Sequence, residues 1–277
     1  MTTHTDRILV LGATGKTGRR VVPRLRTAGV AVRAASRSGE VRFDWFRPET
    51  WQAALEGASA VYLVAPDDPG PVPGFVKQAV AAGAGRFVVL SGRGIEHVDG
   101  DFGQGMAVAE QAVRDSGVEW TIIRPNNFSQ NFDEDLWREP LRAGRLALPI
   151  GDVPEPFVDV EDVAEVAAAL LTRDGHAGRV YELSGPRGLT FAEAAGVIAR
   201  ASGRAIEYVE LTPEEYRDEL LAAGYPEAAV RMLGALFAVH RPGHTAEVTD
   251  GVRRVLGREP AGFESYAVRA AAGGAWS

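Results

Sequence analysis

The chain has 277 residues, enough for one large domain or for a domain with an added lobe. Its net charge of −7 argues against binding to nucleic acid, and the absence of cysteine excludes disulfides, thiolate catalysis and cysteine-ligated metals. No apolar run approaches the length of a membrane span, and the first ten residues lack the apolar core of a signal peptide, so we expect a cytoplasmic protein without membrane contact.

Short β-branched runs alternate with amphipathic segments through the first part of the chain. Apolar residues recur at helical spacing after Gly18 and again from Phe75. Pro23 counts against the first helix, although a kinked helix is still the better interpretation. Strands separated by helices predict an α/β fold, a Rossmann-type doubly wound parallel sheet. The predicted strands are Arg7–Leu11, Val30–Ser36, Ala60–Val64, Arg86–Ser91 and Trp120–Arg124.

This alternation ends after Pro125, and residues 126–156 show no clear period. Asp159 is the expected cap of a helix with an apolar stripe, and a strand is expected over Arg179–Leu183. Two Thr-x-x-Glu boxes, at Thr190 and Thr212, each predict the start of a further helix. We therefore expect a core over residues 1–125 and a smaller, mostly helical lobe over 126–277, interleaved with the last elements of the core. The final segment, AAAGGAWS, is expected to fray.

The segment LGATGKTG contains the Gly-Lys-Thr of a triphosphate loop, but that motif also requires glycine at position 10, where the chain has Val10. The spacing Gly12-x-x-Gly15-x-x-Gly18, between a strand and a helix, is instead that of a dinucleotide loop. Gly12 would make the tight turn, Gly15 would admit the pyrophosphate, and Gly18 would allow close packing of the helix on the sheet. The remaining predicted contacts in this loop are Thr14, Lys16 and Thr17.

The end of the second strand indicates which dinucleotide is bound. The sequence Ala-Ala-Ser36-Arg37-Ser has no carboxylate for the ribose hydroxyls, whereas a guanidinium and a hydroxyl suit a 2′-phosphate. We therefore expect NADP(H) to be preferred, with NAD(H) possible; a solvated surface arginine is the alternative interpretation of Arg37. Further cofactor contacts are predicted at Asp44, Ala65 and Pro66.

Six segments together carry a resemblance to a known family: ILVLGATGKTGRRVV, FVVLSG, AEQAVRDSGVEWTIIRPNNFSQNF, FVDVEDVAEVAAALL, GRVYELSGP and LTFAEAAGVIARASGR. In this order they resemble the NmrA-like, atypical short-chain dehydrogenase/reductase family, and they are similar to its bacterial flavin-free NAD(P)H:quinone oxidoreductases. The resemblance covers most of the chain. It implies that residues 1–125 bind NAD(P) and that the protein is an NAD(P)H-dependent oxidoreductase without flavin or metal.

Orthodox members of this superfamily protonate the substrate with a Tyr-x-x-x-Lys pair, which the resemblance places on the helix before SGVEWTIIRP. Met106 and Glu110 occupy those two positions, and no tyrosine lies between Tyr62 and Tyr181. Methionine has no proton to give, and a glutamate has the wrong charge to lower a phenol pKa. The orthodox mechanism is therefore absent.

Other residues could assist catalysis. Ser91 ends its strand where the superfamily keeps a catalytic serine, and it is either a donor to the substrate or a strand-end cap. His97, in the glycine-rich loop 92–105, is either a substitute acid or a solvated side chain, and Asn127 would orient the substrate ring. His240 and His244 are spaced four apart, but the proline and glycine between them make a zinc site improbable.

A quinone or a related aromatic, polyketide-like ketone fits a site without an acid, because hydride addition yields a delocalised anion that water can protonate. Reaction of the reduced product with oxygen, leading to hydroxylation, is a variant. The alternative is a non-catalytic regulatory protein that senses NADP(H). We expect a small aromatic substrate and a monomer or homodimer. Amides and aromatic rings favour the enzyme, although lobe packing explains some of them; the predicted substrate residues are Met106, Asn126, Phe128, Asn131, Phe132, Trp137 and Phe157.

Overall fold

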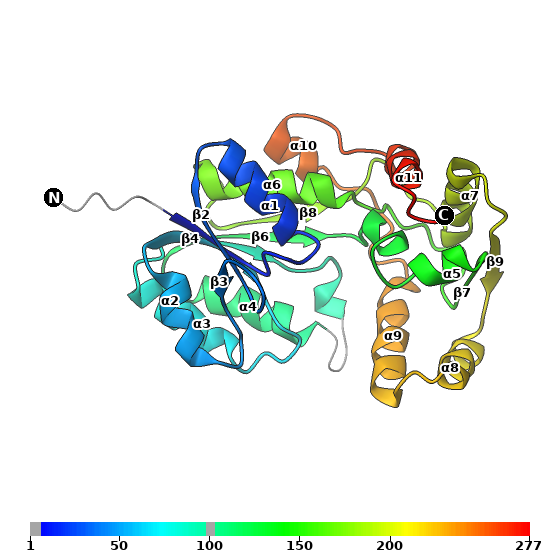
Figure 1. Cartoon of the computed structure of the whole chain (residues 1–277), viewed down its shortest axis with the longest axis horizontal. Helices are drawn as coiled ribbons and strands as arrows, with labels where there is room; N and C mark the ends of the chain where they lie inside the picture. The colour runs from blue at the N-terminus through cyan, green and yellow to red at the C-terminus, as the bar shows by residue number, and fades with distance from the viewer. Residues whose placement is uncertain (1–6, 98–102) are drawn as a thin grey trace.

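The computed structural model describes residues 7–97 and 103–277, and its centre is a parallel sheet of seven strands in the order β3-β2-β1-β4-β5-β6-β8 (Figure 1). This is the strand order of a doubly wound dinucleotide-binding fold, extended by one strand. The predicted α/β, Rossmann-type class is confirmed. The strands are β1 (Arg7–Leu11), β2 (Ala31–Ser36), β3 (Val41–Arg42), β4 (Ala58–Val64), β5 (Arg86–Leu90), β6 (Glu119–Pro125) and β8 (Arg179–Leu183).

Helices cover both faces of the sheet, which is why its strands are apolar at nearly every position. In β1, Ile8 and Val10 pack toward one helical layer, whereas Leu9 and Leu11 pack toward the other. Pro23 lies on the exposed side of α1, which continues past it to Thr27. One layer holds α1 (Gly18–Thr27), α6 (Val160–Thr172) and α10 (Gly251–Leu256); the other holds α2 (Trp51–Leu55), α3 (Val72–Ala81) and α4 (Gln104–Arg114).

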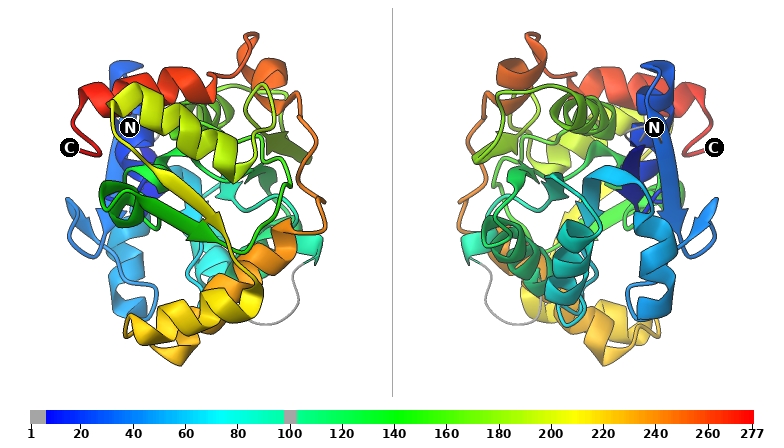
Figure 2. Two further views of the ribbon diagram at one scale, coloured as in Figure 1. Left: turned by 90° about the vertical axis from the view of Figure 1, so that its right-hand side faces the viewer. Right: turned by 90° about the vertical axis from the view of Figure 1, so that its left-hand side faces the viewer.

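A separate group of elements, here called the lobe, lies beyond the carboxyl ends of the central strands and has an aromatic core of its own. Its strands β7 (Arg145–Leu148) and β9 (Glu207–Glu210) pair in parallel, with α7 on one side and α8 and α9 on the other (Figure 2). The lobe helices are α5 (Arg138–Arg142), α7 (Phe191–Ser202), α8 (Pro213–Ala222), α9 (Glu227–His240) and α11 (Phe263–Ala272). Three 3₁₀ helices are η1 (Pro48–Thr50), η2 (Ile95–His97) and η3 (Ser129–Phe132).

The predicted strands of the sheet all form, with ends that differ by at most two residues. The Asp159 carboxylate caps α6 by accepting from the Glu161 N–H at 2.9 Å, and both Thr-x-x-Glu boxes close as expected. The prediction did not include β3, β7 and β9, which have only two to four residues and no clear alternation. The chain also returns from the lobe to the sheet, because β8 pairs with β6 and α10 packs on β8.

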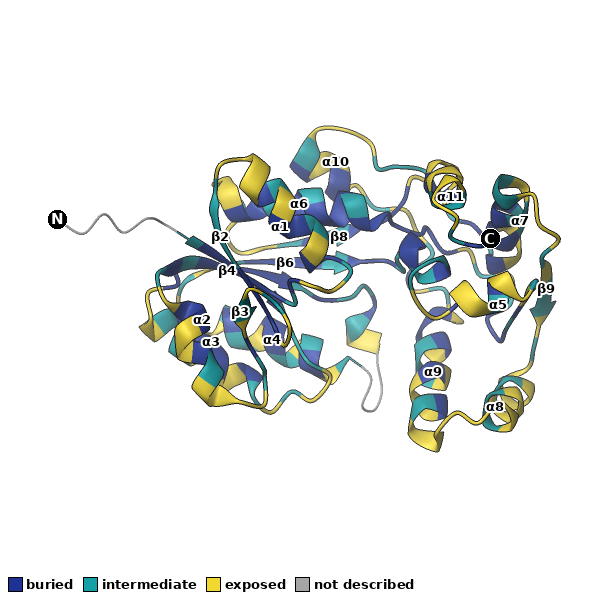
Figure 3. Ribbon diagram, viewed as in Figure 1, coloured by how far each residue is buried: buried dark blue, intermediate teal, exposed yellow. Residues whose placement is uncertain are grey.

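The expectation that the C-terminus frays is wrong. Trp276 is only 1% exposed, and its indole N–H donates to the carbonyl of Phe132 at 2.7 Å. A large aromatic ring buried in the lobe core outweighs the glycines that precede it. In Figure 3 the buried residues lie in the sheet, on the helix faces that pack against it, and in the lobe core, whereas the outer turns of α8 and α9 are exposed. Within the described ranges, no helix is both long and apolar enough to cross a membrane.

Candidate active site

The glycine loop after β1 has the geometry of a dinucleotide loop. Gly12 adopts a φ of +62°, which favours glycine, and its carbonyl accepts the Gly15 N–H at 2.8 Å. A Cβ on Gly18 would lie 2.2 Å from the Gly12 carbonyl oxygen, so only glycine lets α1 start this close to the strand. Thr14 is exposed and Thr17 is buried at the helix start. The loop thus offers a helix N-terminus at the carboxyl edge of the sheet, where a pyrophosphate would bind.

The end of β2 carries features that fit a 2′-phosphate. The Ser36 hydroxyl is buried and has no hydrogen-bond partner among the described residues, and a Cβ on Gly39 would lie 2.6 Å from it. Arg37 and Arg42 are exposed and form no ion pair within the described parts of the chain. Arg42 lies opposite Ser36 in the β2–β3 register and was not predicted, because a two-residue strand gives no periodic signal. A strand end that carries an unpartnered hydroxyl and two arginines without ion pairs is a suitable setting for a phosphate.

The other predicted cofactor residues lie at neighbouring strand ends. Asp44 follows β3, and its carboxylate accepts the N–H of Phe46 at 3.0 Å, which holds the turn there. Ala65 and Pro66 follow β4. A Cβ on Gly105 would lie 1.7 Å from the Pro66 carbonyl oxygen, so α4 begins in direct contact with this segment. Together these positions border the crevice where the strand order reverses, which is the usual place for a dinucleotide.

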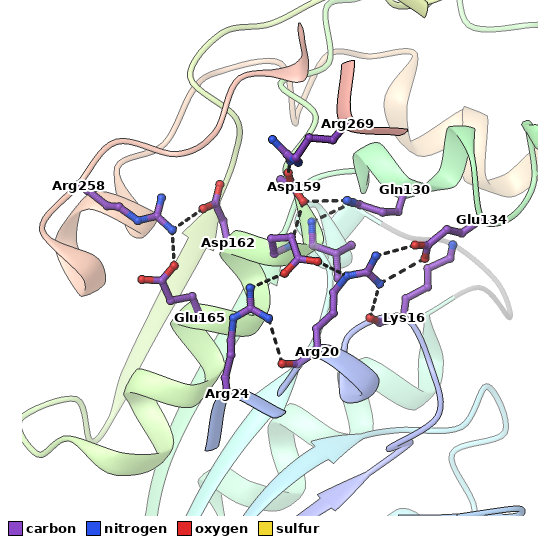
Figure 4. A network of polar contacts seen from close by, with 12 residues as sticks. Lys16, Arg20, Arg24, Gln130, Glu134, Asp159, Asp162, Glu165, Arg258 and Arg269 are labelled. Carbon is purple, nitrogen blue, oxygen red and sulfur yellow. Dashed lines mark hydrogen bonds and ion pairs between the residues drawn. The ribbon is translucent and has the colours of Figure 1, made fainter. Parts of the chain in front are cut away.

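A polar network joins the glycine loop and α1 to the lobe (Figure 4). The Lys16 ammonium donates to the Asn131 amide oxygen at 2.6 Å and to the Asp135 carboxylate at 2.7 Å. Arg20 bonds Glu134 at 2.6 Å and Glu161 at 2.7 Å. Burial alone would lower the pKa of Arg20, but its two carboxylate partners outweigh that effect and raise it. The network fixes the lobe against the cofactor loop.

A cavity of about 580 Å³ opens between the carboxyl ends of β5 and β6 and the lobe. Lys16 borders it on the side of the glycine loop, and Met106 packs on Gly92 at its wall. Its volume is typical of a small-molecule site. All six tyrosines lie in the described part of the chain, and none lines this cavity. Of the predicted residues, those that line it are Ser91, Lys16, Met106, Asn126, Asn127, Phe128 and Asn131.

Ser91 and Glu110 are bonded to each other beneath this cavity. The Ser91 hydroxyl donates to the Glu110 carboxylate at 2.6 Å, and Arg124 donates to the same carboxylate at 2.8 Å. Burial alone would raise the pKa of Glu110, but the hydrogen bonds from Arg124 and Ser91 outweigh it and lower the pKa below its ordinary value. Glu110 is therefore a carboxylate, and the Ser91 hydrogen is used inside the protein. In this arrangement the Ser91 oxygen can accept a hydrogen bond, but it has no hydrogen left to give a substrate.

Comparison with known proteins identifies the family. A family described as NAD(P)H-binding matches residues 12–174, which is more than half of the chain. The chain belongs to this NAD(P)H-binding family. An NAD(P)H azoreductase of Xenophilus azovorans is 32% identical over 97% of this chain and 99% of its own. An NADPH complex of a quinone oxidoreductase of Escherichia coli has the same fold, with a TM-score of 0.79 at 20% identity over 95% and 99% of the two chains. A variant of NmrA has a TM-score of 0.76 at 19% identity over 96% and 95%.

Four of the predicted substrate or catalytic residues do not line the 580 Å³ cavity. Phe132 and Phe157 are fully buried in the lobe core, where their rings pack edge to face at 5.1 Å. Trp137 joins the same core and borders a different cavity, of about 670 Å³, between α5, β7 and α8. His97 stacks on His244 at 4.0 Å and does not line the 580 Å³ cavity. The prediction that these three aromatic residues contact the substrate is corrected: their rings pack in the lobe core. A large apolar ring gains most from full burial. Residues 98–102 of the loop that carries His97 lie outside the described residues.

Three site residues were not predicted, because no local pattern in the sequence assigns them to the site. His240, the last residue of α9, lines the cavity and contacts Asn127. Glu155 is 1% exposed and accepts hydrogen bonds from the Asn126 amide and the Asn127 backbone N–H. Arg93 donates to the Asn126 amide oxygen at 3.0 Å. In the sequence Glu155 is a lone glutamate between two prolines, which is a weak signal, and the spacing of His240 and His244 suggests only a metal ligand. Among the residues described, no group of three or more histidines and carboxylates could hold a metal ion.

Proposed function

We propose that this NAD(P)H-dependent oxidoreductase reduces a quinone or a related aromatic ketone, with NADPH as the preferred hydride donor. The observation that carries the proposal is the cavity of about 580 Å³ at the ends of β5 and β6, whose lining has three asparagine amides, several apolar side chains and no tyrosine. Its other lining side chains are Lys16, Asp67, Ser91, Arg93, Asp135 and His240. A substrate that needs little acid catalysis suits such a site, since its anionic product is delocalised over the ring.

In this proposal the glycine loop and the end of β2 bind the cofactor, and the cavity residues orient the substrate. The Gly12–Gly18 loop would bind the pyrophosphate, and Ser36, Arg37 and Arg42 would bind the 2′-phosphate. NADPH, when bound, supplies the hydride. Met106 offers an apolar wall that keeps water away, and the Phe128 ring with the Asn127 amide would orient a flat, polar substrate ring. Ser91 would accept a hydrogen bond from a hydroxyl but would not protonate a carbonyl oxygen.

The test is the loss of reduced-nicotinamide absorbance when the purified protein, NADPH and 1,4-naphthoquinone are mixed without flavin. We expect turnover with NADPH that exceeds turnover with NADH, and a large loss in Asn127→Ala. Oxygen uptake measured in the same cuvette distinguishes simple reduction from a variant in which the reduced product is hydroxylated. His97→Ala is the control and should leave the rate unchanged, because His97 lies outside the cavity.

If no quinone oxidises NADPH in this assay, the result would favour the alternative, a protein that senses NADP(H) and regulates a partner. Such a protein would bind both cofactor forms, as measured by calorimetry, and would show no turnover over a broad panel of quinones. The azoreductase relative makes azo compounds a sensible second panel, because they too accept hydride into a conjugated aromatic system.

A further inference from the structure

Behind Asn127 lies a row of buried polar side chains that the proposed function does not use. The Asn127 amide nitrogen is 3.0 Å from His240 Nε2, and His240 Nδ1 is 3.1 Å from the Thr245 hydroxyl oxygen. That hydroxyl donates to Glu155 Oε2 at 3.2 Å. His240 is 7% exposed and Glu155 1%, so bulk water does not satisfy these groups. The row connects a buried carboxylate to the cavity wall.

The hydrogen bonds determine which nitrogen of His240 carries its hydrogen. Glu155 is surrounded by donors, namely the Asn126 amide, the Asn127 N–H and the Thr245 hydroxyl, so it is a carboxylate. Because Thr245 gives its hydrogen to Glu155, its oxygen can only accept from His240 Nδ1–H. In a neutral ring Nε2 is then an acceptor, and it needs the amide nitrogen of Asn127 as its donor. The 3.0 Å contact between Asn127 Nδ2 and His240 Nε2 is consistent with a hydrogen bond that the amide donates to the ring.

Adding a proton to His240 reverses that last contact. Nε2–H becomes a donor, so Asn127 must turn its amide by half a rotation and present Oδ1 to the ring. The group that faces the cavity changes at the same time. With neutral His240 the cavity meets an acceptor, Oδ1, which suits a hydroxyl; with charged His240 it meets a donor, Nδ2–H, which suits a carbonyl oxygen.

We propose that His240 is a positioning residue that sets the orientation of the Asn127 amide, so that the protonated form binds the oxidised carbonyl substrate and the neutral form binds the hydroxyl product. The proposal rests on the proposed function for the identity of the ligands. It assigns a substrate-discriminating role to a histidine at the end of α9, more than one hundred residues from Asn127 in sequence.

Charged groups of both signs lie around His240. Glu155 lies 3.4 Å from Nδ1 and provides a counter-charge, and the carboxyl end of α9 carries a partial negative charge. Arg93 approaches from the loop after β5, where it donates to the carbonyl of Thr245 at 3.1 Å, and Glu182 of β8 partly offsets its charge at 3.2 Å. The other charged groups of the cavity wall are Lys16, Asp67 and Asp135.

The first experiment follows nitrogen and amide resonances of the unaltered, ligand-free protein from about pH 5 to about pH 9. We expect the side-chain amide signals of Asn127 to shift with the same midpoint as the ring nitrogens of His240. Asn127 signals that stay constant while His240 titrates, or a His240 that does not titrate in this range, would overturn the proposal.

The second experiment measures ligand affinity with NADP⁺ bound, so that no hydride is available. We expect 1,4-naphthoquinone to bind about five- to tenfold more weakly at about pH 8.5 than at about pH 5.5, and 1-naphthol to show the opposite trend. Both dependences should vanish in His240→Gln and persist in the matched control His97→Gln. Equal pH dependence in the two variants would refute the role of His240.

The two experiments separate the inference from the function. If the resonances titrate together but NADPH is never oxidised by quinones, the amide switch stands and the proposed function fails. If quinones are reduced at a rate and affinity that do not depend on His240, the function stands and the inference fails.

Discussion

The hydroxyl of Ser91 at the end of β5 and the carboxylate of Glu110 in α4 form a buried hydrogen bond of 2.6 Å at the wall of the 580 Å³ cavity. Arg124 from β6 completes the group with a bond of 2.8 Å. These three side chains link two strands and a helix beside the cavity.

We predict that Glu110→Gln destabilises the fold by about 3 kcal/mol, because it leaves Arg124 without its buried partner. Chemical denaturation at neutral pH measures the change. Glu96→Gln is the matched control: Glu96 pairs with the same arginine but is 48% exposed, so its loss should cost less than about 1 kcal/mol. Similar losses in the two variants would contradict the role assigned to Glu110.

The same contact predicts a dependence on pH. The folded-state pKa of Glu110 lies below its ordinary value of 4.5, so its stabilisation is fully present above that pH and is lost as pH falls through the folded value. The difference in unfolding free energy between the wild type and Glu110→Gln should therefore shrink on acidification below about pH 4.5. A difference that stays constant down to the acid-unfolding range would show that ionisation of Glu110 is not its source.

Restoring the Tyr-x-x-x-Lys pair on α4 should not increase the rate of quinone reduction. In Met106→Tyr with Glu110→Lys, the new ammonium would face Arg124 and Arg114 and would leave the Ser91 hydroxyl without its acceptor. We expect no increase in the rate of quinone reduction and a lower unfolding free energy. A sharp acceleration of ketone or quinone reduction in this double variant would mean that the site does lack an acid it needs.

Cofactor preference is expected to depend on the end of β2. Removing the guanidinium in Arg37→Ala should weaken NADPH roughly 10- to 100-fold and leave NADH nearly unchanged, since only NADPH carries the 2′-phosphate. Arg42→Ala should do the same to a similar degree, because Arg42 lies opposite Ser36. Titration calorimetry with both cofactors gives the affinities, and Arg217→Ala on α8 removes an exposed charge as a control. Equal losses for NADPH and NADH would rule out this reading of the strand end.

Substitution by alanine should affect activity at one phenylalanine after β6 and stability at another. Phe128 lines the cavity, so Phe128→Ala is expected to lower kcat/KM for a quinone about 10- to 100-fold. Phe132 is 0% exposed in the lobe core, so Phe132→Ala should lower the unfolding free energy by about 3–5 kcal/mol. Steady-state kinetics and denaturation on both variants separate the roles, and a kinetic defect confined to Phe132 would reverse our assignment.

The C-terminal tryptophan should behave as a core residue. Trp276→Ala removes a ring that is 1% exposed together with its bond to the Phe132 carbonyl, and we expect a loss of about 3–5 kcal/mol. Val268→Ala in α11 is the comparison, because Val268 is 61% exposed and should change stability by less than about 0.5 kcal/mol. Thermal or chemical unfolding that is unaffected by Trp276→Ala would mean that the terminal segment is not part of the lobe.

Local patterns in the sequence determined the class of fold, the glycine loop and the absence of a Tyr-x-x-x-Lys pair on α4. Each of these depends on residues close together in the chain: alternating strands and helices, glycines at a set spacing, and a methionine where a tyrosine would be needed. The aromatic residues after β6 were visible in the sequence too, but nothing local distinguished Phe128 at the cavity from Phe132 and Phe157 in the lobe core.

Only the tertiary structure decided which distant residues meet. Met106, Asn127 and His240 share one cavity because α4, the end of β6 and the end of α9 converge there, and Arg42 faces Ser36 through a strand of two residues. Long-range contacts of this kind come from packing between elements, and a single sequence carries no periodic signal for them. The same is true of Trp276, whose burial depends on a lobe core assembled from segments more than one hundred residues apart.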